Sequence, residues 1–303
     1  MNIRSLTLLF ITNIVISTAG IAQSIDLEKA YNANSVKLLK SYMDSWSSDI
    51  KAISTAELER MPGEVAQAYH LFETFYNPHS LAQLGASKWY SELYKQYTYY
   101  VIQNSINIYQ VDRIYKTDAD VREYIINQMK KTYKDDGQKQ KAIENVNKAN
   151  MNHSVYVENL SPNYPGVTDS SRRLISTIKN FRPRILQVQA SPLYLDSLHN
   201  KAINDFLGND HEPFGQPNVM SIARAAGKSL KKQEFLQKII KINHNHWGNG
   251  WELNTPPYVT ITFDKDFTSA KIDYGLVYEG GHAIYEFKNG SWELLSTKRT
   301  WRE

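Results

Sequence analysis

The stretch SAKIDYGLVYEGGHAIYEFKNGSWELL, residues 269–295, decides the fold of this chain. Apolar and polar residues alternate along it, which is the pattern of strands that place one face on a core. Two dipeptides of turn-forming residues interrupt it, Gly280-Gly281 and Asn289-Gly290. Two-residue turns of these types join antiparallel strands. We therefore expect an antiparallel β-meander in the C-terminal region.

The two predicted turns also fix the register of the meander. The Gly-Gly turn sets Tyr278 opposite Ala283, and the Asn-Gly turn sets Phe287 opposite Trp292. Opposed residues share a face and side chains alternate with period two, so both turns assign one set of apolar residues to the core side. That set is Ala270, Ile272, Tyr274, Leu276, Tyr278, Ala283, Tyr285, Phe287, Trp292 and Leu294, with Val259, Ile261 and Phe263 from a further strand over 258–263.

These motifs resemble the last strands of the NTF2-like and cystatin-like families: a long helix, an apolar-rich strand, a Gly-Gly turn, a strand opening Ala-x-Tyr and a closing Gly-x-Trp-x-Leu. The tail from Phe214-Gly215 through His246-Trp247-Gly248 to Thr300-Trp301 is also similar to exported proteins of Bacteroidetes-type bacteria. The resemblance covers about the last 90 residues and implies a fold and a pocket, but no activity, because NTF2-like domains include enzymes, binding modules and inert scaffolds. No catalytic residue is carried over.

Hydrophobic spacing organises the rest of the chain. Helices are expected over about 27–53, 64–76, 121–129, 191–207 and 221–242, and strands within 97–111, 154–158 and 185–190. The lysine-rich residues 130–148 are expected to form an exposed helix pair or a mobile connector. The predicted class is α+β, with a helical N-terminal unit that carries a small strand pair (23–160) and a C-terminal unit of helices packed on the antiparallel β-meander (161–303).

The N-terminal residues predict export. Residues 1–22 combine a basic start at Arg4, an apolar stretch from Leu6 to Ile16 and small residues before a cleavage site after Ala22, which is the layout of a signal peptide. The apolar stretch is shorter than a bilayer-spanning helix, and no transmembrane segment is expected in the mature chain. The chain has no cysteine, so disulfides, thiolate chemistry and lipoprotein acylation are excluded. We expect a periplasmic or secreted protein.

The amino-acid composition limits the classes of binding partner that we expect. The 35 basic and 31 acidic residues are interspersed, whereas a nucleic-acid-binding protein concentrates its basic residues on one face, so no nucleic acid is expected. The 20 tyrosines and six tryptophans suit either a core or a binding surface. No cofactor is expected, because the sequence lacks Gly-x-Ser-x-Gly, His-Glu-x-x-His and phosphate-binding glycine motifs.

A carboxylate pair is the first candidate site. In the predicted register Glu286 opposes Glu293 on the face away from the core, and His282 opposes Glu279. In a sheltered site one pKa of the carboxylate pair would rise, so Glu286, Glu293 and His282 could act as catalytic acid and base, with Glu279 binding ligand. The alternative is that both carboxylates stand in water or pair with Lys288, Arg299 or Arg302.

The second candidate is His244-x-His246. On an extended segment the two imidazoles point the same way and could bind one metal ion, with His211 or His282 as a third ligand. The alternative is a helix end whose histidines bond exposed carbonyl groups.

Two tryptophans follow these histidines. Trp247 and Trp251 flank Gly248-Asn249-Gly250 and could stack on sugar rings. The alternative is that they fill the base of the sheet.

Together these observations favour an exported binding or interaction protein that uses a pocket or groove between the C-terminal sheet and a helix. Its partner would be a small molecule, a glycan or an envelope protein. The alternatives are a hydrolase or isomerase centred on the carboxylate pair, and a structural component of the envelope without an enclosed pocket.

Overall fold

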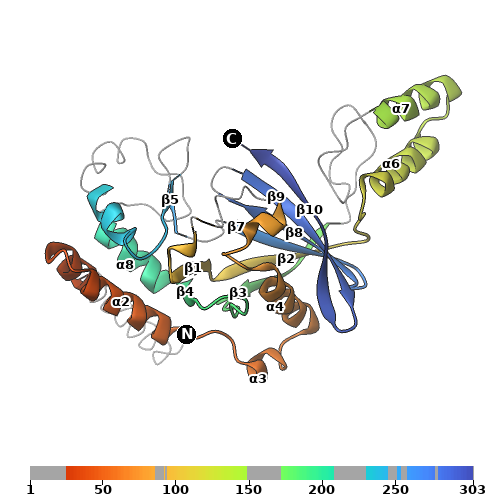
Figure 1. Ribbon diagram of the computed structural model, residues 1–303. Coiled ribbons are helices and arrows are strands. Elements are labelled where there is room, and N and C mark those ends of the chain that lie inside the picture. The colour runs from red at the N-terminus through yellow and green to blue at the C-terminus, as the bar shows by residue number, and fades with distance from the viewer. Residues whose placement is uncertain are drawn as a thin grey trace, which may run out of the picture.

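The structure, a computed structural model, describes residues 25–85, 92, 94–148, 172–207, 230–244, 251–253, 258–276 and 279–302. This part of the chain has the predicted α+β class (Figure 1). It contains a mixed six-stranded sheet, a two-stranded parallel sheet and a short two-stranded antiparallel sheet.

The main sheet has the strand order β10-β9-β8-β7-β2-β3. The predicted antiparallel meander is made of β7 (Tyr258–Asp264), β8 (Ser269–Gly275), β9 (Glu279–Lys288) and β10 (Ser291–Arg302). Strand β2 (Ser105–Val111) joins β7 in parallel, and β3 (Arg173–Lys179) pairs antiparallel with β2. The predicted boundary between residues 160 and 161 lies outside the described residues, but strands from both sides of it share this sheet.

The predicted turn at Asn289-Gly290 is confirmed. Asn289 has φ 52° and Gly290 has φ 81°. Positive φ at both central residues is the geometry that joins strands through an Asn-Gly dipeptide. Trp292 therefore pairs with Phe287 as expected.

The predicted turn at Gly280-Gly281 is wrong, because both glycines lie inside β9. The backbone N–H of Leu276 donates to the carbonyl oxygen of Glu279 at 2.6 Å, so β8 and β9 are connected before the glycines. Gly281 lies opposite Tyr274, and a Cβ at Gly281 would be 2.8 Å from Tyr274 Oη. This glycine is needed where a tyrosine ring approaches the strand, and not in a bend.

The apolar residues of β8 and β9 that were predicted to face the core still lie on that face, although the turn is misplaced. Ala283 pairs with Ile272 instead of Tyr278, a shift of six residues. An even shift keeps the residues of β8, and those of β9 after Gly281, on their predicted faces, whereas Glu279 joins β9 and changes face. The expected core residues that are buried include Val259, Ile261, Phe263, Ala270, Ile272, Tyr274, Leu276, Ala283, Tyr285 and Trp292. Of the other expected core residues, Phe287 is only partly buried and Tyr278 lies outside the described residues. Leu294 is 41% exposed, next to a β-bulge between Leu294 and Ser296.

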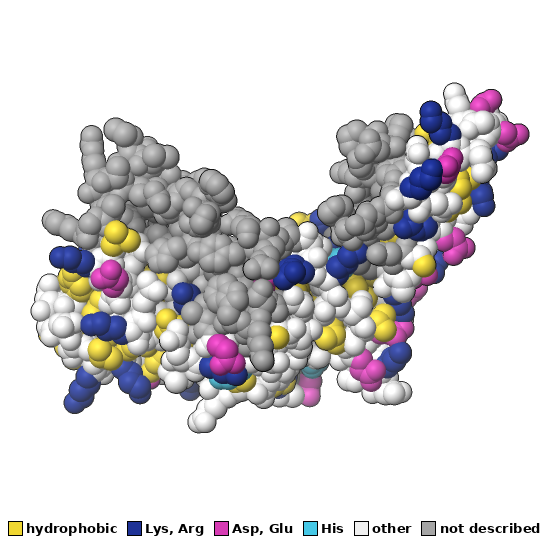
Figure 2. All heavy atoms as spheres, turned by 45° about the horizontal axis from the view of Figure 1, so that its top comes forward, with side chains coloured by type: hydrophobic (Ala, Val, Ile, Leu, Met, Phe, Trp, Pro, Cys, Tyr) yellow, Lys and Arg dark blue, Asp and Glu magenta, His cyan; other side chains and the backbone are white. Residues whose placement is uncertain are grey.

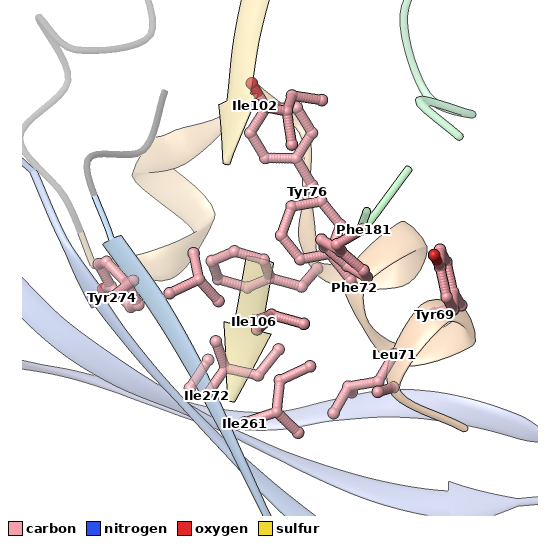
Figure 3. Packing of buried hydrophobic residues seen from close by; sticks show 14 of the residues in the cluster. Tyr69, Leu71, Phe72, Tyr76, Ile102, Ile106, Phe181, Ile261, Ile272 and Tyr274 are labelled. Atoms are coloured by element: carbon pink, nitrogen blue, oxygen red, sulfur yellow. The ribbon is translucent and has the colours of Figure 1, made fainter. Parts of the chain in front are cut away.

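Helix α4 (Gly63–Phe75) covers the core face of this sheet. Its buried aromatic residues, among them Phe72, meet Phe181 and sheet residues such as Ile261 and Ile272 (Figure 3). The 3-10 helix η1 (Leu81–Leu84) adds Leu81 and Leu84 to the same cluster.

Two helical segments replace the single stretch expected over 27–53. Residues 25–32 are helical, and α2 (Val36–Asp49) begins after Asn34, which has a left-handed φ of 45°. Ser35 caps α2 by accepting a hydrogen bond from the Leu38 N–H at 3.3 Å. The short α3 (Thr55–Leu58) follows.

The strands expected within 97–111 are present but do not pair with each other. Strand β1 (Tyr99–Gln103) pairs in parallel with β4 (Ser191–Leu195), whereas β2 enters the main sheet. The strand expected over 185–190 is wrong, because these residues are irregular. The helix start at Ser191-Pro192 is also wrong, because β4 occupies these positions and α8 (Ser197–Leu207) starts after it. Asp196 separates them, and its carboxylate accepts the backbone N–H of His199 at 2.8 Å. Polar Asp196, not Pro192, supplies the helix cap.

The lysine-rich residues 130–148 contain the end of one helix and a second helix, not the exposed helix pair expected there. The first of these is the helix expected over 121–129. Helix α6 (Asp118–Thr132) and α7 (Asp136–Lys148) stand away from the main sheet (Figure 1). They share a small buried cluster of their own, made of Tyr115, Val121, Ile125, Met129 and Val146. Basic and acidic side chains mix over this pair and over the visible described surface (Figure 2).

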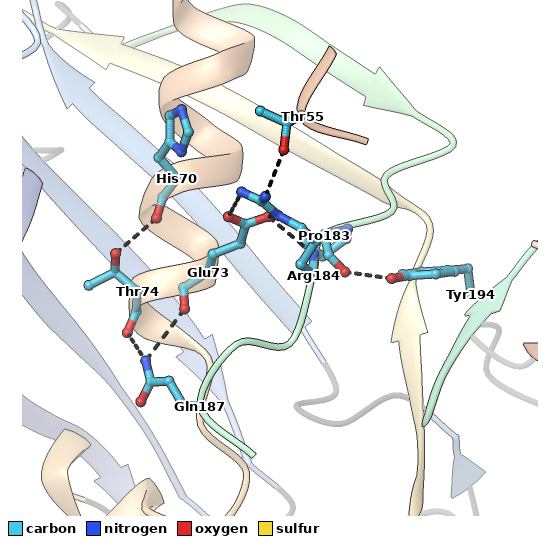
Figure 4. A network of polar contacts seen from close by, with 8 residues as sticks. All are labelled: Thr55, His70, Glu73, Thr74, Pro183, Arg184, Gln187 and Tyr194. Carbon is cyan, nitrogen blue, oxygen red and sulfur yellow. Dashed lines mark hydrogen bonds and ion pairs between the residues drawn. The ribbon is translucent and has the colours of Figure 1, made fainter. Parts of the chain in front are cut away.

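A buried ion pair joins α4 to the segment before β4 (Figure 4). Arg184 donates from Nε to Glu73 Oε1 at 2.8 Å and from Nη2 to Glu73 Oε2 at 2.7 Å. Only 3% of the Glu73 side chain is exposed, against 30% for Arg184. A bidentate pair fixes direction as well as distance. It therefore holds the segment that leads into β4 against the core helix.

Some predicted segments lie partly or wholly outside the described residues. The strand expected over 154–158 does so entirely, as do residues 1–24. Of the helix expected over 221–242, residues 230–242 are described: residues 230–236 are helical, but residues 237–242 are not, so the helix ends earlier than expected. Across the described ranges, no helix combines the length and apolar character needed to cross a bilayer.

Candidate functional site

The structure places Glu286 and Glu293 directly opposite each other on β9 and β10. Both lie on the sheet face away from α4, as the register of the Asn-Gly hairpin predicted. Glu293 is exposed, and 22% of the Glu286 side chain is exposed. The two carboxylates therefore meet at an open part of the sheet.

Two lysines neutralise Glu286. Lys116, just before α6, hydrogen-bonds to one carboxylate oxygen, and Lys288 lies 2.5 Å from the other. These hydrogen bonds, first from Lys116 and then from Lys288, lower the pKa of Glu286 to about 2. Glu286 is thus ionised at neutral pH, and its pKa is lowered, not raised as expected for a member of a sheltered carboxylate pair. This is the ion-paired alternative stated above, with Lys288 as one of the partners named there.

His282 and Glu279 lie apart from this pair. His282 shares a strand and a face with Glu286, but four residues of strand separate their Cα atoms by about 13 Å. Glu279 is an odd number of residues from His282 and takes the opposite face of β9, where Arg299 Nη1 donates to it at 3.3 Å. The shift of the Gly-Gly connection is the reason that they do not oppose each other.

The sheet face that carries His282 holds buried polar residues that sequence reasoning missed. His282 opposes Asp273, and Lys271 Nζ lies 2.8 Å from Asp273 Oδ1. Thr262 opposes Lys271 and is fully buried. The alternation of Lys271 and Asp273 with core residues of β8 is the signal that could have found them. They form a sheet-spanning polar row, without a described pocket beside it.

The histidine and tryptophan candidates fall largely outside the described residues. Residues 245–250, which include His246 and Trp247, are not described. The backbones of His244 and Trp251 pair in the two-residue strands β5 (Asn243–His244) and β6 (Trp251–Glu252). Among the residues that the structure describes, no group of three or more His, Asp or Glu side chains is placed to hold a metal ion.

A pocket of about 230 Å³ opens beside α2, and none of the predicted site residues that the structure describes lines it. Residues 25–32 contribute Asp26 and Lys29 to its wall, and α8 contributes His199. The remaining wall comes from one side of α2: Leu38, Ser41, Tyr42, Ser45 and Trp46. Figure 1 shows α2 and α8 near each other on the side of the molecule away from the α6–α7 pair.

The inner wall of this pocket is rigidly built. The rings of Trp46 and His199 are stacked, with centroids 4.5 Å apart and planes 6° apart. Trp46 Nε1 donates to the carbonyl oxygen of Tyr194 at 3.0 Å, and His199 Nδ1 lies 2.8 Å from Asp196 Oδ1. A carboxylate can only accept, so Nδ1 carries the proton in this contact. Burial raises the pKa of Asp196, but its hydrogen bonds from His199 outweigh burial and the net shift is downward.

Tyr42 lines the same wall, and its hydroxyl group is unsatisfied. The residue is 7% exposed, and its Oη is buried without a hydrogen-bond partner. Burial raises the pKa of Tyr42, and the negative charges of Asp196, Asp26 and Asp49 raise it further. The phenol is therefore protonated and remains a hydrogen-bond donor. Leaving such a buried group unsatisfied costs about 1–3 kcal/mol.

Sequence reasoning missed this pocket. Tyr42 and Trp46 carry only the helical spacing that also marks a core face. The spacing of Asp196 and His199 is the signal of a helix cap, but it was hidden by placing the helix start at Pro192. Trp46 and its acceptor Tyr194 are 148 residues apart, so no local pattern joins them.

The arrangement is suited to binding. Nucleophilic catalysis needs a hydroxyl group hydrogen-bonded to a base. Ser41 Oγ instead donates to the carbonyl oxygen of Lys37 at 3.1 Å. What the pocket presents is an aromatic wall, hydroxyl groups and one buried donor.

No protein-family model, curated protein or solved structure matches this chain. The resemblance of its C-terminal strands to known families therefore stays a prediction.

Proposed function

We propose that this chain is an exported protein whose mature form binds a small molecule in the pocket between α2 and α8. The pocket takes the place of the sheet-side groove expected from the sequence. The observation that carries the proposal is that Tyr42 lines this pocket and that its buried hydroxyl group has no hydrogen-bond partner. A ligand that accepts a hydrogen bond from Tyr42 removes the cost of that unsatisfied donor.

The rigid wall supports the same proposal. Because Trp46 is fixed by Tyr194 and stacked on His199, it does not need to be ordered when a ligand binds. Binding then avoids much of the entropy cost of fixing side chains. The carboxylate pair gives an enzyme less support, because Glu286 is held as an ionised partner of two lysines.

The test is a set of NMR titrations of the mature chain, starting at Gln23. The probes are glucose, galactose, mannose, N-acetylglucosamine, glucosamine, glucuronate, choline, phenol and phosphate. A Trp46→Phe variant assigns the indole N–H signal of Trp46. We expect at least one probe to shift this signal together with the backbone signals of Tyr42 and His199. If every probe leaves these three signals unmoved, the proposed function is wrong.

A further inference from the structure

The α2–α8 pocket also restricts the chemistry of its ligand. Its volume of about 230 Å³ is smaller than the 300–1,000 Å³ of pockets for drug-sized molecules. A molecule of about one substituted six-membered ring fits this size.

Charge disfavours an anion. The Asp196, Asp26 and Asp49 carboxylates all act on the Tyr42 hydroxyl group. The cation at the pocket wall, Lys29, lies 3.2 Å from Asp26, and both side chains are largely exposed, so solvent screens both charges and the less exposed Asp196 dominates. A negatively charged ligand that reached Tyr42 would therefore be repelled.

Hydrogen-bonding capacity disfavours a simple cation. Tyr42 needs an acceptor, and an ammonium group has only donors. Hydroxyl and carbonyl oxygens accept a hydrogen bond without carrying charge. A ligand hydroxyl group can also donate to a wall oxygen, such as Ser41 Oγ, whose own proton is directed to the Lys37 carbonyl oxygen.

The wall also offers apolar contact. Leu38 and the rings of Tyr42 and Trp46 line the pocket next to Ser41 and Ser45. An aromatic face packs well against the C–H groups of a ring that carries hydroxyl groups at its edge.

We infer that the ligand of this pocket is an uncharged, hydroxyl-bearing molecule of about the size of one sugar ring. The inference rests on the proposed function, because it names the ligand class for the same site. It commits to direct hydrogen bonding between a neutral ligand oxygen and the hydroxyl group of Tyr42.

Three probes with one ring and different charge test the ligand class: glucose, glucosamine and glucuronate. Calorimetry would compare them with galactose, mannose and N-acetylglucosamine at low and high salt. We expect at least one neutral sugar to bind with an affinity that salt does not change, and glucuronate to bind at least several-fold more weakly than glucose.

Asp26→Asn supplies the matched variant. It should raise the affinity for glucuronate and leave that for neutral sugars unchanged, because it removes one of the charges that act on Tyr42. Asp266→Asn changes the net charge equally at an exposed loop of the main sheet and should change neither affinity.

The outcomes separate the two claims. If glucuronate, phosphate or choline shifts the signals of Trp46, Tyr42 and His199 while no neutral sugar does, the ligand class is wrong and the proposed function stands. If no probe shifts them, both are wrong. If neutral sugars bind but Asp26→Asn and Asp266→Asn act alike on glucuronate, the electrostatic argument is overturned.

Discussion

His199 lies flat against Trp46, with ring planes only 6° apart, although the two residues come from helices far apart in the sequence. Asp196 holds the imidazole from its edge, and the Tyr194 carbonyl oxygen holds the indole. One ring from α2 and one from α8, held by two residues that precede α8, thus build a single aromatic wall.

Replacing His199 tests the structural importance of this wall. His199→Ala removes the stacked ring and the Asp196 contact, so we expect the free energy of unfolding to fall by about 1–2 kcal/mol. Urea denaturation would measure it. His70→Ala is the control, since His70 is exposed on α4 and its loss should change stability by less than about 0.5 kcal/mol. If the two substitutions changed the free energy of unfolding equally, the stack of His199 on Trp46 would not be important for stability.

Gly281 makes a prediction about backbone space. In Gly281→Ala the new Cβ would clash with Tyr274 Oη and with the Lys298 carbonyl oxygen. We expect a loss of at least about 3 kcal/mol, or failure to fold, because the backbone contact cannot relax. Gly63→Ala is the counterpart: nothing lies within 4 Å of its Cβ, so stability should rise by up to about 1 kcal/mol. Thermal melts that rank the two variants in the opposite order would refute this reading.

The pair of Glu73 and Arg184 makes a prediction about buried charge. Removing one partner of a fully buried ion pair lowers the free energy of unfolding by about 3–5 kcal/mol. Because Arg184 is partly exposed, we expect Glu73→Ala to lower it by about 2–3 kcal/mol. Chemical denaturation of Glu144→Ala, which removes a solvent-exposed pair with Lys148, should show an unchanged midpoint. A Glu73→Ala midpoint equal to that of the wild type would count against the pair.

Glu286 makes a prediction about pH. Its pKa falls from an ordinary value of 4.5 to about 2 in the folded chain, chiefly through Lys116 and then Lys288. A depressed folded pKa stabilises the fold above the ordinary pKa, and the contribution is lost as pH falls through the folded pKa. The free energy of unfolding of the wild type should therefore exceed that of Glu286→Gln above about pH 5, and the difference should disappear as the pH falls from about 5 to 2. A difference in stability that stays constant over this window, measured by urea denaturation, would exclude the ion-pair explanation.

Much of the sheet could be predicted because alternation and the Asn289-Gly290 turn depend on neighbours in sequence. The Gly280-Gly281 dipeptide led to a wrong position for the turn between β8 and β9, because glycine occurs both in tight turns and where a ring packs closely against the backbone. The Asn289-Gly290 turn correctly predicted that Glu286 and Glu293 lie opposite each other. The contact of Lys116 with Glu286 could not be predicted, because it depends on the path of the chain after β2. The pocket could not be found, because Tyr42 and Asp196 meet only through packing of distant helices.

Two tyrosines with unsatisfied buried hydroxyl groups allow a matched comparison of stability. Tyr76 Oη, in the core under α4, is buried without a partner, as is Tyr42 Oη at the pocket. Removing such a hydroxyl group should raise the free energy of unfolding of the ligand-free chain by about 1 kcal/mol in either Tyr42→Phe or Tyr76→Phe. A loss of stability in either variant, measured by urea denaturation, would show that its hydroxyl group has a stabilising partner.

The affinities of these same two variants for the best-binding neutral sugar test the central claim most directly. Calorimetry should show binding weakened roughly three- to ten-fold in Tyr42→Phe, the loss of one neutral hydrogen bond, and unchanged in Tyr76→Phe. Equal affinity of the wild type and Tyr42→Phe would contradict the claim that the pocket binds its ligand through this hydroxyl group.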